Sequence, residues 1–423
     1  MKGGVFVVVA TFATAAAGLL ACLGEDPNLV LSRDAASDVP APPFDAHEPI
    51  EDGGREPLPP RYLLSFYDGN SSTEVVVLEA DGGLAGTVAF DDRFGLTRAS
   101  GAHVYFLRGE REAVVRLDSS EPWKPRSSWR VASPAPDGSV TETSEGRLID
   151  IVDVGPKAYV LSALRNQIAV IHPDEETTDG GVASWIDLSP LVSPNDGDRL
   201  VNPVSGVFDA KRGRVYVVLS AWDVTVEAPA DATGCPNFRS AVTAIDIQTD
   251  SVVSMGGDGV EGSVLLSGAV AHGITLDSDG DRLLIDSGGC ENIDPTKRRR
   301  VVEEVRLTDA RVTTLLSLND RPPGALRYVG PTQAAVTFYN GTYRWDPTTS
   351  ALGLPLGTGV RLAELDRDGH VIGSRSSDSD GGSLLEIVRV SWDSGDETVV
   401  ATNPMTDKRS VLLSLTLWPP VEP

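Results

Sequence analysis

The chain has 423 residues, of which 61 are acidic and 36 basic, so its formal net charge at pH 7 is −25. Such a surface repels nucleic acid and anionic headgroups at long range, and we therefore expect no nucleic-acid partner. The one basic cluster, residues 297–300, is interpreted as a solvated loop that leads into a strand.

Residues 1–21 have the pattern of a secretory signal peptide. Lys2 precedes an apolar run over residues 5–20, and Ala21 supplies a small residue at the cut site. The run is shorter than the roughly 20 residues that span a bilayer. A plain secretory signal with a chance cysteine and a transmembrane anchor are the two alternatives.

The ending Leu19-Leu20-Ala21-Cys22 resembles the lipobox of bacterial lipoproteins. The resemblance implies cleavage before Cys22 and a lipid on its sulfur, hence a membrane partner. Leu23 stands where an aspartate would imply retention in the inner membrane, so we expect the outer membrane of the cell envelope. Several acyl chains on one cysteine hold a protein firmly.

Residues 22–60 are predicted to form a disordered tether. Residues 23–60 contain eight prolines, nine acids and two arginines, and their apolar residues show no period. A segment of this composition buries too little surface to offset its ordering entropy. It separates the lipidated end from whatever domain follows.

From residue 61 to 423 the chain is predicted to be all-β. Short runs rich in Val, Ile, Leu, Tyr and Thr alternate with turn sequences, several of them Asp-Gly. A multi-strand unit recurs, with tyrosines at 62, 105, 159 and 216 and with Leu284 in the next copy. Repeats of this length indicate a β-propeller. We predict seven blades, with six or eight as alternatives, starting near residues 62, 95, 148, 205, 271, 325 and 360.

The segments around Tyr105, Tyr159 and Tyr216 resemble the Tyr-Val-Thr-Asn (YVTN) repeats of surface-layer and lactonase-like propellers, and Tyr159-Val-Leu-Ser162 is the nearest match. The resemblance covers residues 61–418 and implies a propeller. The first blade lacks one strand, and residues 411–418 are predicted to supply it and close the ring. The alternative is an edge strand on the last blade.

Cys235 and Cys290 are predicted to form a disulfide, because an exported chain meets an oxidising compartment. The chain-entropy model makes such a bridge worth roughly 4 kcal/mol. Two inert or metal-binding thiols are the alternative.

The acids Asp277, Asp279 and Asp281 alternate in a tight loop and form a candidate calcium site. The alternative is a hairpin turn without metal. Calcium is the one cofactor that the sequence leaves open. Trp123 and Trp222, in or beside long loops, are candidates for lining a sugar or peptide site, with packing as the alternative.

The sequence contains no Gly-x-Ser-x-Gly, phosphate-loop or His-Glu-x-x-His motif, and no catalytic residue is predicted. We expect a monomeric envelope module that binds or scaffolds a protein or glycan through the loops at 172–184, 190–204 and 222–240. A lactonase-like or quinoprotein-like enzyme and an accessory of outer-membrane assembly are the alternatives.

Overall fold

The computed structural model describes 17 segments of the chain between residues 60 and 418, namely residues 60–67, 72–93, 95–131, 147–163, 165–178, 180–194, 199–220, 239–268, 270–277, 279–288, 300–318, 326–330, 333–338, 341–366, 369–379, 382–404 and 411–418. The predicted signal peptide, Cys22 and the tether up to residue 59 lie outside these segments. Among the described residues, regular structure is β-strand apart from two short 3-10 helices, η1 (Ser189–Leu191) and η2 (Val260–Gly262). No helix in these segments is both long and apolar enough to cross a membrane.

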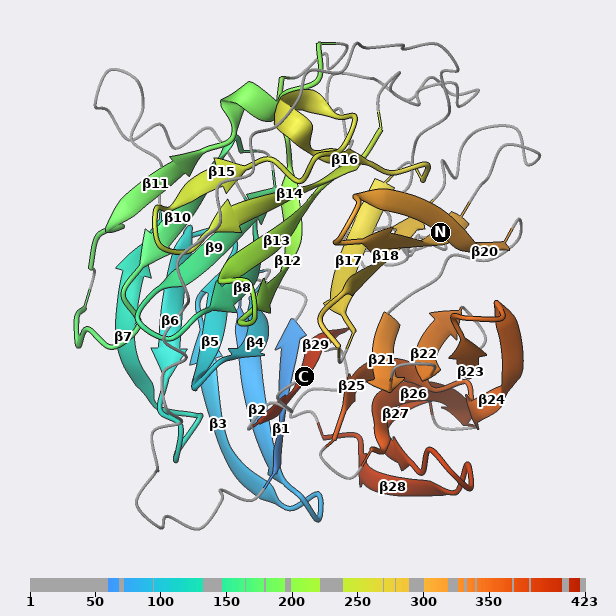
Figure 1. The fold of residues 1–423 in the computed structure, drawn as a ribbon. Helices are drawn as coiled ribbons and strands as arrows, with labels where there is room; N and C mark the ends of the chain where they lie inside the picture. Colours follow the sequence, from blue (N-terminus) through green and yellow to red (C-terminus); the bar gives the residue numbers. More distant parts are fainter. Residues whose placement is uncertain are drawn as a thin grey trace, which may run out of the picture.

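The strands form seven antiparallel sheets arranged around a common centre (Figure 1), which confirms the predicted seven-bladed propeller. The strands of each blade are given from the inner to the outer one. Blade 1 consists of β29 (Val411–Trp418), β1 (Arg61–Tyr67), β2 (Thr73–Glu79) and β3 (Leu84–Phe90), and blade 2 of β4 (Leu96–Ser100), β5 (His103–Arg108), β6 (Ala113–Leu117) and β7 (Pro125–Arg130). Blade 3 consists of β8 (Arg147–Asp153), β9 (Ala158–Ala163), β10 (Gln167–Ile171) and β11 (Ser184–Asp187).

Blade 4 consists of β12 (Pro203–Asp209), β13 (Arg214–Leu219) and β14 (Ala241–Asp246), followed by β15 (Ser251–Val253) and β16 (Val264–Leu265). Blade 5 consists of β17 (Val270–Leu276), β18 (Arg282–Gly288), β19 (Arg300–Arg306) and β20 (Arg311–Leu318). Blade 6 consists of β21 (Leu326–Gly330), β22 (Gln333–Phe338), β23 (Gly341–Asp346) and β24 (Ala351–Thr358). Blade 7 consists of β25 (Arg361–Leu365), β26 (Val371–Ser379), β27 (Gly382–Val390) and β28 (Glu397–Thr402). The inner strands of blades 2 to 7 begin within two residues of the predicted blade starts. The start predicted near residue 62 coincides with β1, the second strand of blade 1.

The core lies between the blades, because each strand turns alternate side chains toward its two neighbouring sheets. In β9, Tyr159 and Leu161 pack with residues of blade 4, whereas Ala158 and Val160 pack with residues of blade 2. The repeated tyrosines Tyr105, Tyr159 and Tyr216 are all buried. The unit that recurs in the sequence is therefore a packing unit, since each copy fills the space toward the next blade.

The ring closes through β29, as predicted, and the alternative of an edge strand on the last blade is wrong. The C-terminal strand β29 pairs antiparallel with β1, with Trp418 opposite Arg61 and Leu415 opposite Leu64. The Nε1 of Trp418 also donates to the carbonyl of Ser119 in blade 2 (2.9 Å). Closure removes the exposed edge that β1 would otherwise present.

We expect Leu417→Ala to lower the free energy of unfolding by about 2–5 kcal/mol, because it opens a cavity in the closing strand. Leu417 is 3% exposed and packs in the cluster shared by blades 7 and 1. The matched control is Leu354→Ala on the outer strand β24, where the leucine is 76% exposed; there we expect a change within about 0.5 kcal/mol. Urea unfolding of the two variants measures the difference, and equal losses would contradict this account of closure.

Candidate functional site

Five inner strands carry a β-bulge at a similar place. The pairing with the second strand skips Ile149 in β8, Val204 in β12, His272 in β17, Ala363 in β25 and Leu413 in β29. A bulge bends its strand and changes the direction of the side chains that follow. The residue after the bulge is polar in four of these strands (Asp150, Ser205, Glu364 and Ser414) and glycine in the fifth (Gly273).

A first polar network joins the inner strands of blades 2, 3 and 4. The Nε of Arg98 on β4 lies 3.3 Å from Oδ1 of Asp150 on β8. The other carboxylate oxygen of Asp150 accepts hydrogen bonds from the Ser205 hydroxyl (3.2 Å) and the Gly206 N–H (3.1 Å) on β12. Arg98 also donates to the carbonyl of Ile149 (3.1 Å). The ion pair and the hydrogen bonds to Asp150 together connect three adjacent inner strands.

Blade 5 reverses the arrangement found in blades 3, 4 and 7. In blades 3, 4 and 7 the second strand places an apolar residue opposite the first residue after the bulge, namely Leu161, Val218 and Ile372. In blade 5 the inner residue is Gly273 and its partner on β18 is Asp286. A Cβ on Gly273 would lie 2.5 Å from the carboxylate oxygen of Asp286, so the acid needs glycine at this point. The carboxylate occupies a position that holds an apolar residue in blades 3, 4 and 7 and Ser65 in blade 1.

Asp286 is only 5% exposed. Burial raises the pKa of its carboxyl to about 7, and the positive charge of Arg327 on β21 partly opposes this rise. Arg327 in turn lies 3.6 Å from the carboxylate of Glu364 on β25. A second charged cluster therefore joins blades 5, 6 and 7. The sequence prediction missed Asp286, although a charged residue at a position that holds Leu or Val in neighbouring repeats was the signal for it.

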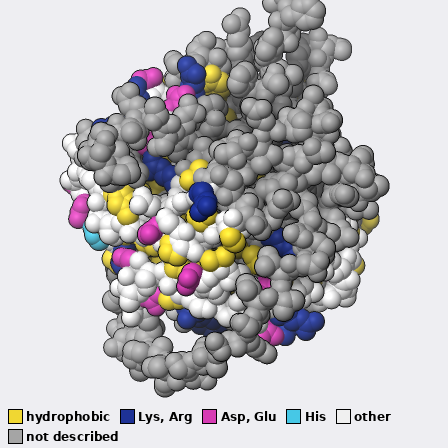
Figure 2. Space-filling model, turned by 90° about the horizontal axis from the view of Figure 1, so that it is seen from above, with side chains coloured by type: hydrophobic (Ala, Val, Ile, Leu, Met, Phe, Trp, Pro, Cys, Tyr) yellow, Lys and Arg dark blue, Asp and Glu magenta, His cyan; other side chains and the backbone are white. Residues whose placement is uncertain are grey.

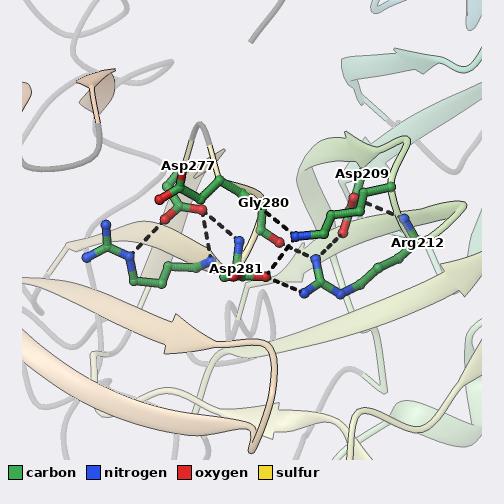
Figure 3. A network of polar contacts seen from close by, with 8 residues as sticks. Asp209, Arg212, Asp277, Gly280 and Asp281 are labelled. Carbon is green, nitrogen blue, oxygen red and sulfur yellow. Dashed lines mark hydrogen bonds and ion pairs between the residues drawn. The ribbon is translucent and has the colours of Figure 1, made fainter.

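The three candidate calcium ligands lie in the turn between β17 and β18, beside the corresponding turn of blade 4 (Figure 3). Asp277 accepts hydrogen bonds from the N–H groups of Asp281 (2.8 Å) and Arg282 (3.0 Å) and from the Arg282 side chain (2.8 Å). Asp281 is paired with Arg212 (2.7 Å) and Lys211 (3.3 Å). Hydrogen bonding to Arg212 lowers the pKa of Asp281.

Asp279 contributes its backbone carbonyl, which accepts a hydrogen bond from Lys211 (3.1 Å). The described segments contain no group of three or more His, Cys, Asp or Glu residues placed to hold a metal. What the turn does in this structure is to connect blades 4 and 5 through Arg212, which pairs with Asp209 and Asp281. Calcium binding by the three acids stays a prediction.

Asp277 belongs to a set that recurs at the end of four inner strands. Its equivalents are Asp153, Asp209 and Asp366, and each accepts a hydrogen bond from an N–H within its own turn. Asp153 also lies 2.7 Å from the imidazole Nδ1 of His103 and accepts the hydroxyl of Tyr105 (2.8 Å), both in blade 2. These acids organise hairpins, and Asp153 also ties blade 3 to blade 2.

The candidate binding-loop tryptophan Trp123 is half-buried between blades 1 and 2. Its ring packs on Gly86, where a Cβ would lie 2.4 Å away, and the Arg61 guanidinium lies 5.5 Å from the ring centroid. This geometry is the packing role that was the alternative to ligand binding. Trp222, Cys235 and Cys290 lie outside the described residues, as does Cys22.

Comparisons with known proteins identify the fold. No family model and no curated protein matches the chain. Among solved structures, a putative 6-phosphogluconolactonase from Bacteroides fragilis is similar over 85% of this chain and 98% of its own, with a TM-score of 0.52 and 11% identity. A putative 6-phosphogluconolactonase from Bacteroides uniformis covers 85% and 99%, with a TM-score of 0.51 and 9% identity.

The domain therefore shares the propeller fold of these two structures. The architecture that the YVTN-like repeats implied is therefore confirmed. Identities this low show the arrangement of the strands and leave the chemistry to this chain's own residues.

We expect the free energy of unfolding to fall as pH rises between about 4 and 7, because the native state keeps a proton on Asp286 that the unfolded chain has already released. The raised pKa of Asp286, about 7, corresponds to a loss of roughly 4 kcal/mol across this window. Asp286→Asn removes this pH-dependent loss. The free energy of unfolding of the variant should therefore exceed that of the wild type by an amount that grows as pH rises. The exposed-site control Asp393→Asn should keep the wild-type dependence, and a parallel slope for Asp286→Asn would contradict the assignment.

Proposed function

We propose that this chain is an exported, lipid-anchored propeller that binds a protein or glycan of the cell envelope on one face of its disk. The observation that carries the proposal is the unequal length of the connections on the two faces. Four long connections, at 131–146, 188–202, 220–240 and 289–299, leave the ends of strands that share one face. They follow one another through blades 2 to 5.

The opposite face carries mostly short turns, such as 154–157, 210–213 and 307–310. The connection at 172–183 is its one long segment. The prediction that residues 172–184 would act together with the other two loops is therefore wrong. That connection joins the third and fourth strands of blade 3, and antiparallel order brings it out on the other face.

Rigid strands that present variable connections on one side are a common basis for recognition. The charged inner residues Arg98, Asp150, Arg327 and Glu364 add polar groups of both signs near the centre of the disk. The lipobox-like Cys22 and the proline-rich tether support a location at the membrane, with the propeller held away from it. This arrangement suits a tethered binding module.

Site-specific photocrosslinking in the native envelope tests the proposal. A photoreactive residue at Glu110 or Pro190 lies on the face of the long connections, and one at Asp81 or Asp309 lies on the face of the turns. All four positions are exposed. We expect discrete adducts from Glu110 and Pro190 and none from the other two, because the partner meets one face only.

Cys22→Ala provides the control for the anchor. We expect this variant to move from the detergent phase to the aqueous phase on detergent partitioning, and to lose the adducts because it no longer stays near its partner. Adducts from the face of the turns, or detergent partitioning that is unchanged without Cys22, would contradict the corresponding part of the proposal.

A second candidate function is the hydrolysis of a sugar lactone, and one observation favours it. Asp286 is a buried carboxyl whose pKa is raised to about 7, and Arg327 places a positive charge nearby. Such a group suits general-base catalysis at neutral pH. Asp286 would take a proton from water as its oxygen attacks the lactone carbonyl, and Arg327 would stabilise the oxyanion. The ring C–O bond then breaks, and the leaving oxygen takes the proton back from Asp286.

If this second function holds, the purified domain hydrolyses glucono-δ-lactone faster than the buffer does, and kcat/KM rises with pH up to about 7 because Asp286 acts in its deprotonated form. We expect Asp286→Asn to lower kcat by about 10²- to 10⁴-fold. Proton release followed with an indicator dye measures the rate. Turnover no faster than in buffer, or undiminished by Asp286→Asn, would exclude the hydrolase.

A further inference from the structure

The outer strand of blade 4 is broken into two pieces. Both β15 and β16 pair with β14: Ser251–Val253 lies beside one end of that strand and Val264–Leu265 beside the other. Residues 254–263 between the two pieces leave the sheet and include η2. In each of the other six blades the outer strand is a single segment within the described residues. Blade 4 therefore carries an excursion at its rim that the propeller does not need for closure.

Backbone hydrogen bonds hold this excursion in a definite conformation. Gly262 accepts from Met255 (3.0 Å) and Gly257 (3.2 Å), and Ser263 accepts from Gly259 (2.8 Å). Glu261 adopts a φ of 53°, which costs free energy in a residue with a side chain. Local strain of this kind is found most often where a segment serves binding or catalysis.

A cavity of about 420 Å³ lies between the excursion and β20, the outer strand of blade 5. Its size falls within the range of small-molecule sites. The lining residues include one cation, one anion, two hydroxyls and an apolar surface: Arg239, Asp258, Ser267, Thr314, Leu265 and Val312. Figure 1 shows β15, β16 and β20 at the periphery, away from the inner strands that carry the charged clusters described above.

A buried carboxylate makes one wall of the cavity rigid. Glu303 on β19 is fully buried and accepts hydrogen bonds from the N–H (2.8 Å) and hydroxyl (2.7 Å) of Ser267 and from the N–H of Gly268 (2.9 Å). The Ser267 hydroxyl also lies 3.2 Å from that of Thr314. The two hydroxyls are thus held in place before any ligand arrives, which reduces the entropy cost of binding.

We propose that this rim pocket binds a short peptide in its zwitterionic form. Asp258 receives the N-terminal ammonium and Arg239 receives the C-terminal carboxylate, while Leu265 and Val312 contact an aliphatic side chain. A guanidinium has five N–H donors and can bind a carboxylate alongside another partner. A ligand with both charges and an apolar part matches this lining. Figure 2 shows one face of the molecule, on which basic, acidic and hydrophobic side chains are interspersed.

Calorimetric titration of the purified domain with glycyl-leucine tests the pocket. We expect Arg239→Gln and Asp258→Asn each to weaken binding by about 10- to 100-fold, the effect of removing one charged hydrogen-bonded partner. Amidating the dipeptide's carboxylate, or acetylating its amine, should weaken wild-type binding by a similar factor. The Arg239→Gln variant should bind the amidated dipeptide no more weakly than the unmodified one. The Asp258→Asn variant should likewise bind the acetylated dipeptide no more weakly than the unmodified one.

Arg130→Gln and Asp393→Asn are matched controls, since both residues are exposed and lie in blades 2 and 7; binding should be unchanged in them. Failure of glycyl-leucine to bind at millimolar concentration would overturn the proposal. The proposal would also be overturned if both pocket variants bound glycyl-leucine as tightly as the wild type does, or if only one of the two variants bound it more weakly. The crosslinking and lactone experiments use other residues, so their outcome is independent of this one.

Discussion

The pairing of β29 with β1 is the constraint on which the rest of this structure depends. It joins the two ends of a region more than 350 residues long, and loop-closure entropy opposes such a contact until packing between blades repays it. Once the ring is closed, each inner strand has a neighbour on both sides and its bulge has a defined direction. The ion pairs of the inner ring follow from this, because Arg98, Asp150 and Ser205 belong to three different blades.

The charged residues of the inner ring include some that stabilise the fold and one, Asp286, that destabilises it. The contact between Arg98 and Asp150 joins two partly exposed groups of opposite charge, which supports the register between blades at modest gain. Asp286 is different, because its carboxyl replaces apolar core and loses its hydration. Gly273 makes room for it, so two positions of blade 5 depart from the repeat together. A coordinated departure that lowers stability is characteristic of a residue kept for function.

Repetition made much of the fold predictable. The spacing of Tyr62, Tyr105, Tyr159 and Tyr216 located the first four blades. Tyr105, Tyr159 and Tyr216 each fill the space toward the next blade, whereas Tyr62 packs toward blade 7. The missing strand of the first blade and the apolar run near residue 415 indicated the closure. The site was harder to predict. The calcium loop was selected because its acids are adjacent in sequence, whereas Arg212, which pairs with Asp281, comes from another blade. No local pattern contains a partner that lies about 70 residues away.

By itself, the sequence determined the period of the repeat, the apolar filling of each blade, the acidic surface and the lipobox-like start, because these depend on residue type and local spacing. Only the tertiary structure decided which charged groups meet across the inner ring and on which face each connection emerges. It also decided that the excursion of blade 4 and β20 line an open pocket. These features arise from contacts between blades. Antiparallel alternation and ring closure set such contacts, and neither is encoded within a single repeat.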